Sequence, residues 1–227
     1  MLAFAVFCLS TLAQDYSKEE LLGKFDPSKQ SGFSKIEKKY TEKDNIYLRT
    51  EAYNSFVTMA AAAKKEGITL KILSATRNFD YQKGIWETKW KRPHYKSWED
   101  AEKVMDIMHY SAMPGASRHH WGTDVDFNSV DPSYFAAGIG KKTYDWLCEY
   151  GAEYGFAQTY TTKKYGRTGY EEEKWHWSYM PIAKEMLKAY NATISYTDLR
   201  GFNGAEAAKT VGVFKDFVNG IDDALKK

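Results

Sequence analysis

Hydrophobic and polar positions along the chain predict helices separated by short strands. Between residues 49 and 66, Tyr53, Phe56 and Ala60 recur at intervals of three and four, which is the spacing of one helix face, and Gly67 ends the pattern. Similar patterns predict further helices over residues 17–22, 78–90, 97–110, 141–154 and 181–190, and a last helix near the C-terminus.

The predicted strands are shorter. Residues 68–74 alternate and are rich in β-branched side chains, which favours a strand. Residues 123–127 also alternate, so Asp124 and Asp126 are expected on one face of a strand. Weaker strand candidates cover residues 45–48, 155–159 and 172–179. Because helices dominate and the strands are spread out, the sequence predicts an α+β fold with a small central antiparallel sheet flanked by helices.

The N-terminal segment MLAFAVFCLSTLA (residues 1–13) has the length of a signal-peptide hydrophobic region and is too short to span a bilayer. We interpret it as a secretory signal cleaved near Ala13, although no Lys or Arg precedes it; the alternative is a buried N-terminal helix. This interpretation predicts an exported protein of the periplasm or cell envelope, without a stable membrane span after cleavage. The rest divides into an N-terminal arm (14–44), a main domain (45–190) and a C-terminal helical extension (191–227).

Composition narrows the class of protein. With 227 residues, 43% of them hydrophobic, the chain suits one domain with a substantial core, and we expect a monomer. A net charge of +2 does not indicate the excess of basic residues that is typical of nucleic-acid-binding proteins. Aromatic residues reach 16%, which fits either a cleft for sugars or peptides or an aromatic core. Cys148 is the one cysteine left after signal removal, and its apolar surroundings predict a core position.

Two segments carry candidate chemistry: SRHHWGTDVD (117–126) and EKWHW (173–177). A catalytic zinc site needs three nitrogen or oxygen ligands and one open position for water, and a separate carboxylate must take the proton of that water. The two segments hold these residue types. To bring them together, the chain must turn near Gly122 and bend between Glu173 and His176, since residues three apart face opposite sides of a regular strand. The residues alone are compatible with a zinc hydrolase.

The first segment resembles the pattern S-x-H-x-x-G-x-x-x-D, and the second resembles E-x-W-H. Both patterns are typical of the D-alanyl-D-alanine carboxypeptidases of the LAS group (lysostaphin, D-Ala-D-Ala carboxypeptidase, Sonic hedgehog), which include the vancomycin-resistance-type D,D-carboxypeptidases. The resemblance covers about residues 45–190 and implies an LAS/hedgehog-like zinc peptidase fold. It further implies that His119, Asp126 and His176 bind Zn²⁺, that Glu173 is the catalytic base, and that Ser117 helps to hold the substrate.

A third segment, ATRNFDYQ (75–82), resembles the family's substrate-binding block, in which an Arg precedes a Gln by five residues. The resemblance implies that Arg77 binds the terminal carboxylate of the substrate and that Gln82 contacts its backbone. A planar guanidinium suits this role because it can bind a carboxylate through two parallel hydrogen bonds. The family often has Tyr-Arg-Ser where this chain has Thr76-Arg77-Asn78, so an ordinary ion-pair role for Arg77 stays an alternative.

Asp124 departs from the family, which often has Ala at this position. We expect Asp124 to accept a hydrogen bond from a ligand histidine rather than to bind the metal, with a surface position as the alternative. His120 is expected to point away from His119, and Arg118 to be a surface charge. Packing roles are expected for Trp121, Trp175 and Trp177.

These expectations combine into a zinc-dependent carboxypeptidase that removes the C-terminal D-Ala from peptidoglycan stem peptides. An L,D-carboxypeptidase or a peptidoglycan endopeptidase would use the same zinc site. A non-catalytic zinc-binding module, as in hedgehog-type relatives, is the alternative from another class; Glu173 argues against it, since a structural site has no need of an acid that does not bind the metal.

Overall fold

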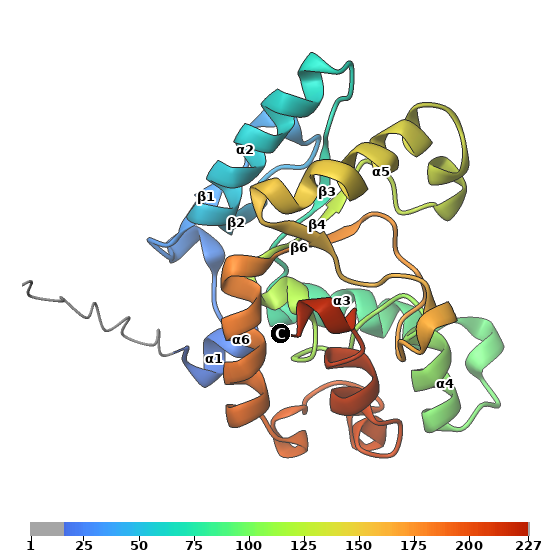
Figure 1. The fold of residues 1–227 in the computed structure, drawn as a ribbon. Helices are drawn as coiled ribbons and strands as arrows, with labels where there is room; N and C mark the ends of the chain where they lie inside the picture. Colours follow the sequence, from blue (N-terminus) through green and yellow to red (C-terminus); the bar gives the residue numbers. More distant parts are fainter. Residues whose placement is uncertain (1–15, 227) are drawn as a thin grey trace, which may run out of the picture.

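A computed structural model describes residues 16–226 (Figure 1). The predicted signal peptide (1–13) therefore lies outside the described residues. The strands of the main sheet are β3 (Ile72–Ser74), β4 (Asp124–Phe127), β5 (Phe156–Gln158) and β6 (His176–Tyr179). They are arranged in the order β3-β4-β6-β5, and each neighbouring pair is antiparallel. A second antiparallel pair joins β1 (Phe33–Lys35) to β2 (Tyr47–Arg49). The predicted α+β class with a small antiparallel sheet is confirmed.

Helices cover both faces of the main sheet (Figure 1). The α-helices are α1 (Lys18–Leu21), α2 (Thr50–Lys65), α3 (Phe79–Trp90), α4 (Asp100–Ile107), α5 (Gly138–Tyr150) and α6 (Met180–Thr193), and a π-helix spans Val213–Val218. Short 3-10 helices are Pro27–Lys29, Lys38–Tyr40, Pro93–Tyr95, Arg118–Trp121, Pro132–Ala136, Gly151–Tyr154, Lys163–Tyr165, Tyr196–Asp198, Ala205–Ala208 and Asp223–Leu225. Within residues 16–226, none of the helices has the length and apolar character needed to cross a membrane.

Local signals explain where several helices begin. The side chain of Ser17 accepts a hydrogen bond from the Glu20 amide (3.1 Å) at α1, and Asn78 accepts one from the Tyr81 amide (2.9 Å) at α3. Some predicted boundaries were wrong. The strand predicted over 172–179 begins only at His176, and the helix predicted over 97–110 is limited to α4. In place of the regular helix predicted for the C-terminal extension, the chain forms the π-helix and 3-10 turns.

The buried hydrophobic residues of the described chain form two clusters on opposite sides of the main sheet. One lies beneath α2 and α5 and takes Val125 and Phe127 from β4 and Trp177 and Tyr179 from β6. The other joins α1, α3, α4, α6 and the C-terminal extension. Because strand side chains alternate, the residues between those four core positions point to the other face of the sheet, toward the second cluster. The candidate site residues of β4 and β6 therefore lie between the two clusters.

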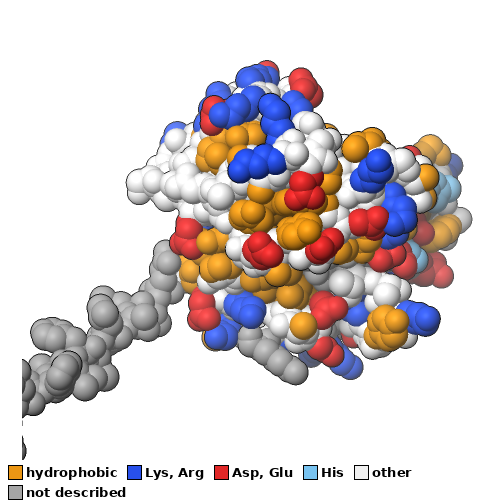
Figure 2. All heavy atoms as spheres, turned by 45° about the horizontal axis from the view of Figure 1, so that its top comes forward, with side chains coloured by type: hydrophobic (Ala, Val, Ile, Leu, Met, Phe, Trp, Pro, Cys, Tyr) orange, Lys and Arg blue, Asp and Glu red, His pale blue; other side chains and the backbone are white. Residues whose placement is uncertain are grey.

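Cys148 corrects one prediction, because it is exposed rather than part of the core. The buried positions of α5 are Gly140, Thr143, Trp146 and Leu147, which follow the spacing of a helix face. Cys148 comes one residue after this face, so its side chain reaches solvent. Lys, Arg, Asp and Glu side chains are interspersed on the face of the molecule seen in Figure 2.

The arm and the C-terminal extension are both packed onto the main domain. Leu21 and Leu22 of the arm are buried in the second cluster. Lys18 forms an ion pair with Asp198 (2.9 Å), which links the arm directly to the C-terminal extension. The arm also contacts the segment that carries the first histidines, since the indole N–H of Trp121 donates to the Leu21 carbonyl (3.3 Å).

Candidate metal centre

Strands β4 and β6 place two of the predicted ligands side by side. Asp126 pairs with His176 in the antiparallel register, and Asp124 pairs with Ser178. Side chains directly opposite one another in such a pair share a face. All four are buried and lie on the face away from Val125 and its core cluster. The period-two pattern of the sequence thus determines this half of the site.

The third predicted ligand, His119, reaches the sheet through a tight turn. A 3-10 helix, Arg118–Trp121, precedes Gly122, whose φ of +71° lies in the left-handed region that glycine adopts readily. The predicted turn at Gly122 is confirmed. The turn is tied to the chain after β3, because the Arg77 amide donates to the His119 carbonyl (3.1 Å) and His119 Nδ1 bonds the Ala75 carbonyl (2.7 Å).

A second turn places Glu173 beside the same site. The His176 amide donates to the Glu173 carbonyl (3.2 Å), and β6 begins only at His176. The bend required by the spacing of these residues is therefore present. It brings Glu173 Oε2 within 3.5 Å of His176 Nδ1. Burial raises the pKa of Glu173 above its ordinary value, although His176 opposes this rise.

His119, Asp126 and His176 form a group whose potential ligand atoms lie within 4.8 Å of one another, and all three are buried. Asp126 Oδ1 lies 3.4 Å from His119 Nε2 and 3.3 Å from His176 Nδ1. Tetrahedral ligands about 2.0–2.1 Å from a zinc ion are about 3.3–3.4 Å apart. Among the described residues 16–226, His119 Nε2 and Asp126 Oδ1 are buried without a hydrogen-bond partner. The spacing and the unpartnered atoms both fit a bound divalent metal.

The remaining ring nitrogens of the histidines are already bonded. His119 Nδ1 faces a carbonyl, which only accepts, so this nitrogen carries the proton and Nε2 keeps a lone pair. His176 Nε2 donates to Asp124 Oδ2 (2.8 Å), which leaves the lone pair on Nδ1. The lone pairs therefore belong to the atoms that face Asp126. Hydrogen bonds of this kind are typical of metal-binding histidines, because they fix the ring orientation and the tautomer.

Asp124 accepts a hydrogen bond from His176, the histidine that the sequence predicts as a ligand, and the metal-binding role of His176 stays a prediction. Asp124 is fully buried, and Arg118 Nε (3.1 Å), the Ser178 hydroxyl (2.5 Å) and the Thr123 hydroxyl (2.7 Å) also donate to its carboxylate. Burial alone would raise the pKa of Asp124, but the Arg118 guanidinium and the bond from His176 hold this pKa well below its ordinary value.

Arg118 is not the surface charge that the sequence predicted, since only 2% of it is exposed. The 3-10 helix turns its side chain toward the sheet, where it also donates to the Ser178 hydroxyl (2.9 Å). A buried carboxylate such as Asp124 requires a nearby cation. The presence of Asp124 on a predicted strand was therefore the sequence signal that could have indicated a buried position for Arg118. His120 is buried as well, with its ring bonded to the Arg77 carbonyl (2.6 Å) and the Gly115 amide (2.9 Å).

A small cavity of about 20 Å³ opens beside His119 and His176, two of the three predicted ligands. Such a volume holds about one water-sized group. It is lined by Arg77, Tyr110, Ala112, Ser117, Arg118, His119, Tyr160, Tyr170, Glu173 and His176. The structure thus brings Glu173, Ser117 and Arg77 together. The three tyrosines were not singled out from the sequence, because they lie in irregular segments where no periodicity locates them.

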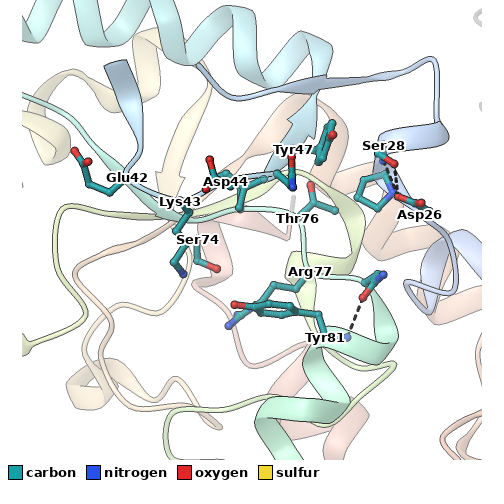
Figure 3. A pocket seen from close by; sticks show the side chains of 15 residues that line it. Asp26, Ser28, Glu42, Lys43, Asp44, Tyr47, Ser74, Thr76, Arg77 and Tyr81 are labelled. Carbon is teal, nitrogen blue, oxygen red and sulfur yellow. Dashed lines mark hydrogen bonds between the residues drawn. The ribbon is translucent and has the colours of Figure 1, made fainter. Parts of the chain in front are cut away.

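Gln82 does not line this cavity. Its amide nitrogen donates to the Ala112 carbonyl (2.7 Å), so Gln82 supports the cavity wall, and its contact with a substrate stays a prediction. Arg77 lines the small cavity and also a wider pocket of about 780 Å³ (Figure 3). This pocket is bounded by arm residues 26–28, by 42–47 and by the segment after β3, and Arg77 and Tyr81 extend from one side of it.

Comparisons with known proteins agree with this geometry. A family model, VanY, D-alanyl-D-alanine carboxypeptidase, matches residues 45–182. A D-alanyl-D-alanine carboxypeptidase of Enterococcus faecalis is 31% identical over 124 residues, which cover 53% of this chain and 44% of the relative. The Bacillus subtilis protein YodJ is 31% identical over 163 residues, 70% of this chain and 56% of the relative. The chain spans about half the length of these curated relatives.

Solved structures share the fold. An LdcB LD-carboxypeptidase aligns with a TM-score of 0.56 at 23% identity, covering 83% of this chain and 81% of that chain. A vancomycin resistance D,D-pentapeptidase, VanY, solved in complex with Zn(II), aligns with a TM-score of 0.52 at 23% identity, covering 76% and 93%. The predicted LAS-type zinc peptidase fold is confirmed. The matched residues 45–182 contain both segments of the site, and the chain belongs to the VanY family of D-alanyl-D-alanine carboxypeptidases.

Proposed function

We propose that this protein is a zinc-dependent carboxypeptidase that removes the C-terminal D-Ala from peptidoglycan stem peptides. The observation that carries the proposal is the buried group His119, Asp126 and His176, two of whose members, His119 and His176, line a cavity together with Glu173 and Arg77. A structural metal site requires neither a neighbouring acid nor a guanidinium, whereas a carboxypeptidase requires both.

His119, Asp126 and His176 would hold the zinc. When bound, the ion supplies Lewis-acid chemistry, which acidifies a water molecule and polarises a carbonyl group. Glu173 takes the proton of the attacking water and returns it to the amine that leaves. Its position next to His176 supports this role, since the carboxylate lies at the edge of the cavity rather than within the ligand group.

Arg77 binds the terminal carboxylate of the substrate. Its Nε is buried and has no hydrogen-bond partner in the described part of the chain, so a donor remains for a ligand. A guanidinium at this point selects chains that end in a free carboxylate. Ser117 lines the same cavity and helps to hold the substrate, while Gln82, which supports the cavity wall at Ala112, contacts the substrate backbone.

An L,D-carboxypeptidase or an endopeptidase would use the same residues, and the products separate these reactions. We further propose an exported, monomeric enzyme of the cell envelope, with the catalytic unit at 45–190 between the arm and the C-terminal extension. Peptidoglycan lies outside the cytoplasm, which supports export.

The test compares the zinc-loaded variants Glu173→Gln and Glu172→Gln with the wild type. Glu172 is the adjacent acid and does not line the cavity, so it is the matched control. We expect Glu173→Gln to keep one zinc per chain by native mass spectrometry and to lose about 10²–10⁴-fold in D-Ala release. Glu172→Gln should retain the wild-type rate. Wild-type release by zinc-bound Glu173→Gln would refute the proposed base.

A further inference from the structure

We propose that Tyr170 is a further catalytic residue, whose phenol donates a hydrogen bond to the oxygen of the scissile carbonyl as that oxygen becomes an oxyanion. The inference rests on the proposed peptidase function. Tyr170 is 2% exposed and lines the cavity together with Glu173, His176 and Arg77. Its hydroxyl is buried and, within residues 16–226, has no hydrogen-bond partner.

The missing partner indicates a site for a ligand. Buried phenols nearly always find an acceptor. Elsewhere in this chain they do: the Tyr190 hydroxyl donates to the Gly115 carbonyl (2.9 Å), and the Tyr179 hydroxyl donates to the Glu51 carboxylate (2.8 Å). Tyr170 differs because it lines the cavity beside His119 and His176. An acceptor that arrives with the substrate would satisfy it.

The surroundings of Tyr170 keep the phenol protonated. Burial raises its pKa most strongly, the Glu173 carboxylate raises it further, and the Arg77 guanidinium opposes this rise. The pKa therefore stays far above neutrality, so the group is a donor and not a base. Tyr170 also lines one cavity with both the predicted base, Glu173, and the predicted carboxylate-binding residue, Arg77.

The C-terminal extension holds Tyr170 in place. The ring packs against Phe217 (centroids 5.1 Å apart) and Tyr160 (4.8 Å). Gly169, just before it, has a φ of +78°, and a Cβ there would lie 2.0 Å from the Asp216 carbonyl oxygen. Phe217 and Asp216 lie outside the matched residues 45–182. The extension thus fixes the donor before the substrate binds, which is the arrangement that makes oxyanion stabilisation effective.

The reaction balances without a change in the protonation state of Tyr170. The water oxygen forms a bond to the carbonyl carbon, the carbonyl electron pair moves to its oxygen, and Glu173 takes the water proton. When the carbonyl re-forms, the carbon–nitrogen bond breaks, and the leaving nitrogen keeps the electron pair and receives the proton from Glu173. Tyr170 donates only a hydrogen bond, which is strongest while the oxygen is negative.

The test is Tyr170→Phe, which removes one oxygen and keeps the ring. Tyr165→Phe is the matched control, because Tyr165 is 82% exposed and does not line the cavity. With zinc-loaded enzyme and a synthetic pentapeptide stem, we expect Tyr170→Phe to lower kcat about 10–100-fold while KM changes less than about threefold. Tyr165→Phe should match the wild type. A phosphinate analogue, which mimics the oxyanion, should bind Tyr170→Phe more weakly by a similar factor.

A merely structural hydroxyl would give another pattern. Because the hydroxyl has no hydrogen-bond partner among residues 16–226, Tyr170→Phe should keep its zinc and should not lower the Tm of the chelated protein. Three results for Tyr170→Phe would overturn the role of Tyr170 while the wild type still releases D-Ala. They are an unchanged kcat, a change in KM alone, and a lower kcat that is accompanied by a lower zinc content or a lower Tm. A zinc-bound wild type that releases no D-Ala would instead refute the proposed function itself.

Discussion

Replacing Asp124 with alanine tests the buried network behind the metal site. Asp124 and Arg118 are at most 2% exposed, and the Arg118 guanidinium has its ion pair with Asp124 and one bond to the Ser178 hydroxyl. Asp124→Ala leaves this guanidinium buried without a counter-charge. Breaking such a pair costs about 3–5 kcal/mol of unfolding free energy. Urea unfolding of the chelated protein measures this loss independently of the metal.

The same substitution removes the acceptor that orients His176. Loss of an acceptor behind a metal-binding histidine typically lowers metal affinity about 10–100-fold, and a competition titration with a zinc chelator would measure this change. Asp145→Ala is the control, because its ion pair with Lys141 is exposed and contributes at most about 1 kcal/mol.

A double variant separates charge burial from lost packing. Asp124→Ala combined with Arg118→Met removes both charges, and we expect it to regain at least about 1 kcal/mol relative to Asp124→Ala alone. If chelated Asp124→Ala unfolded within about 1 kcal/mol of the wild type, the network would not stabilise the fold in the way that its burial implies.

Two further predictions concern other parts of the fold. Gly122→Ala should lower the unfolding free energy by about 1–3 kcal/mol in urea titrations, because φ is +71° and the new Cβ would lie 2.3 Å from a Phe33 ring carbon; an unchanged midpoint would contradict this. For Asp198, burial would raise the pKa, but bonds from Ser195 and the ion pair with Lys18 lower it from 3.8 to about 2. A lowered folded-state pKa stabilises the protein above the unfolded-state pKa, and this contribution is lost as pH falls through the folded-state value. Asp198→Asn should therefore cost about 1 kcal/mol of unfolding free energy at neutral pH and only a small part of this near pH 2. An equal cost at the two pH values would refute the assignment.

The sequence predicted the part of the site that local rules determine. Alternation along residues 123–127 placed Asp124 and Asp126 on one face, and glycine chemistry located the turn at Gly122. The spacing of Glu173 and His176 required a bend, and a turn is present. These features depend on residues close together in the chain, which a sequence pattern records directly.

The parts that the sequence did not predict depend on tertiary contacts. Arg118 is buried because Asp124 lies beneath the turn that carries it, and no periodicity around Arg118 records this. Tyr170 lies in an irregular segment, where Phe217 from the C-terminal extension determines its position. Cys148 is exposed because it lies one position beyond the buried face of α5. The apolar composition of this segment does not show which of its residues face the core.

Metal analysis coupled to a muropeptide digest tests the central claim most directly. Purified protein, with its zinc content measured, is incubated with pentapeptide muropeptides with and without a chelator, and the products are identified by mass spectrometry. We predict one zinc per chain and the release of a single terminal D-Ala, abolished by the chelator and restored by added zinc. Zinc-bound protein that leaves every muropeptide intact, or release that continues after the metal is removed, would contradict the account.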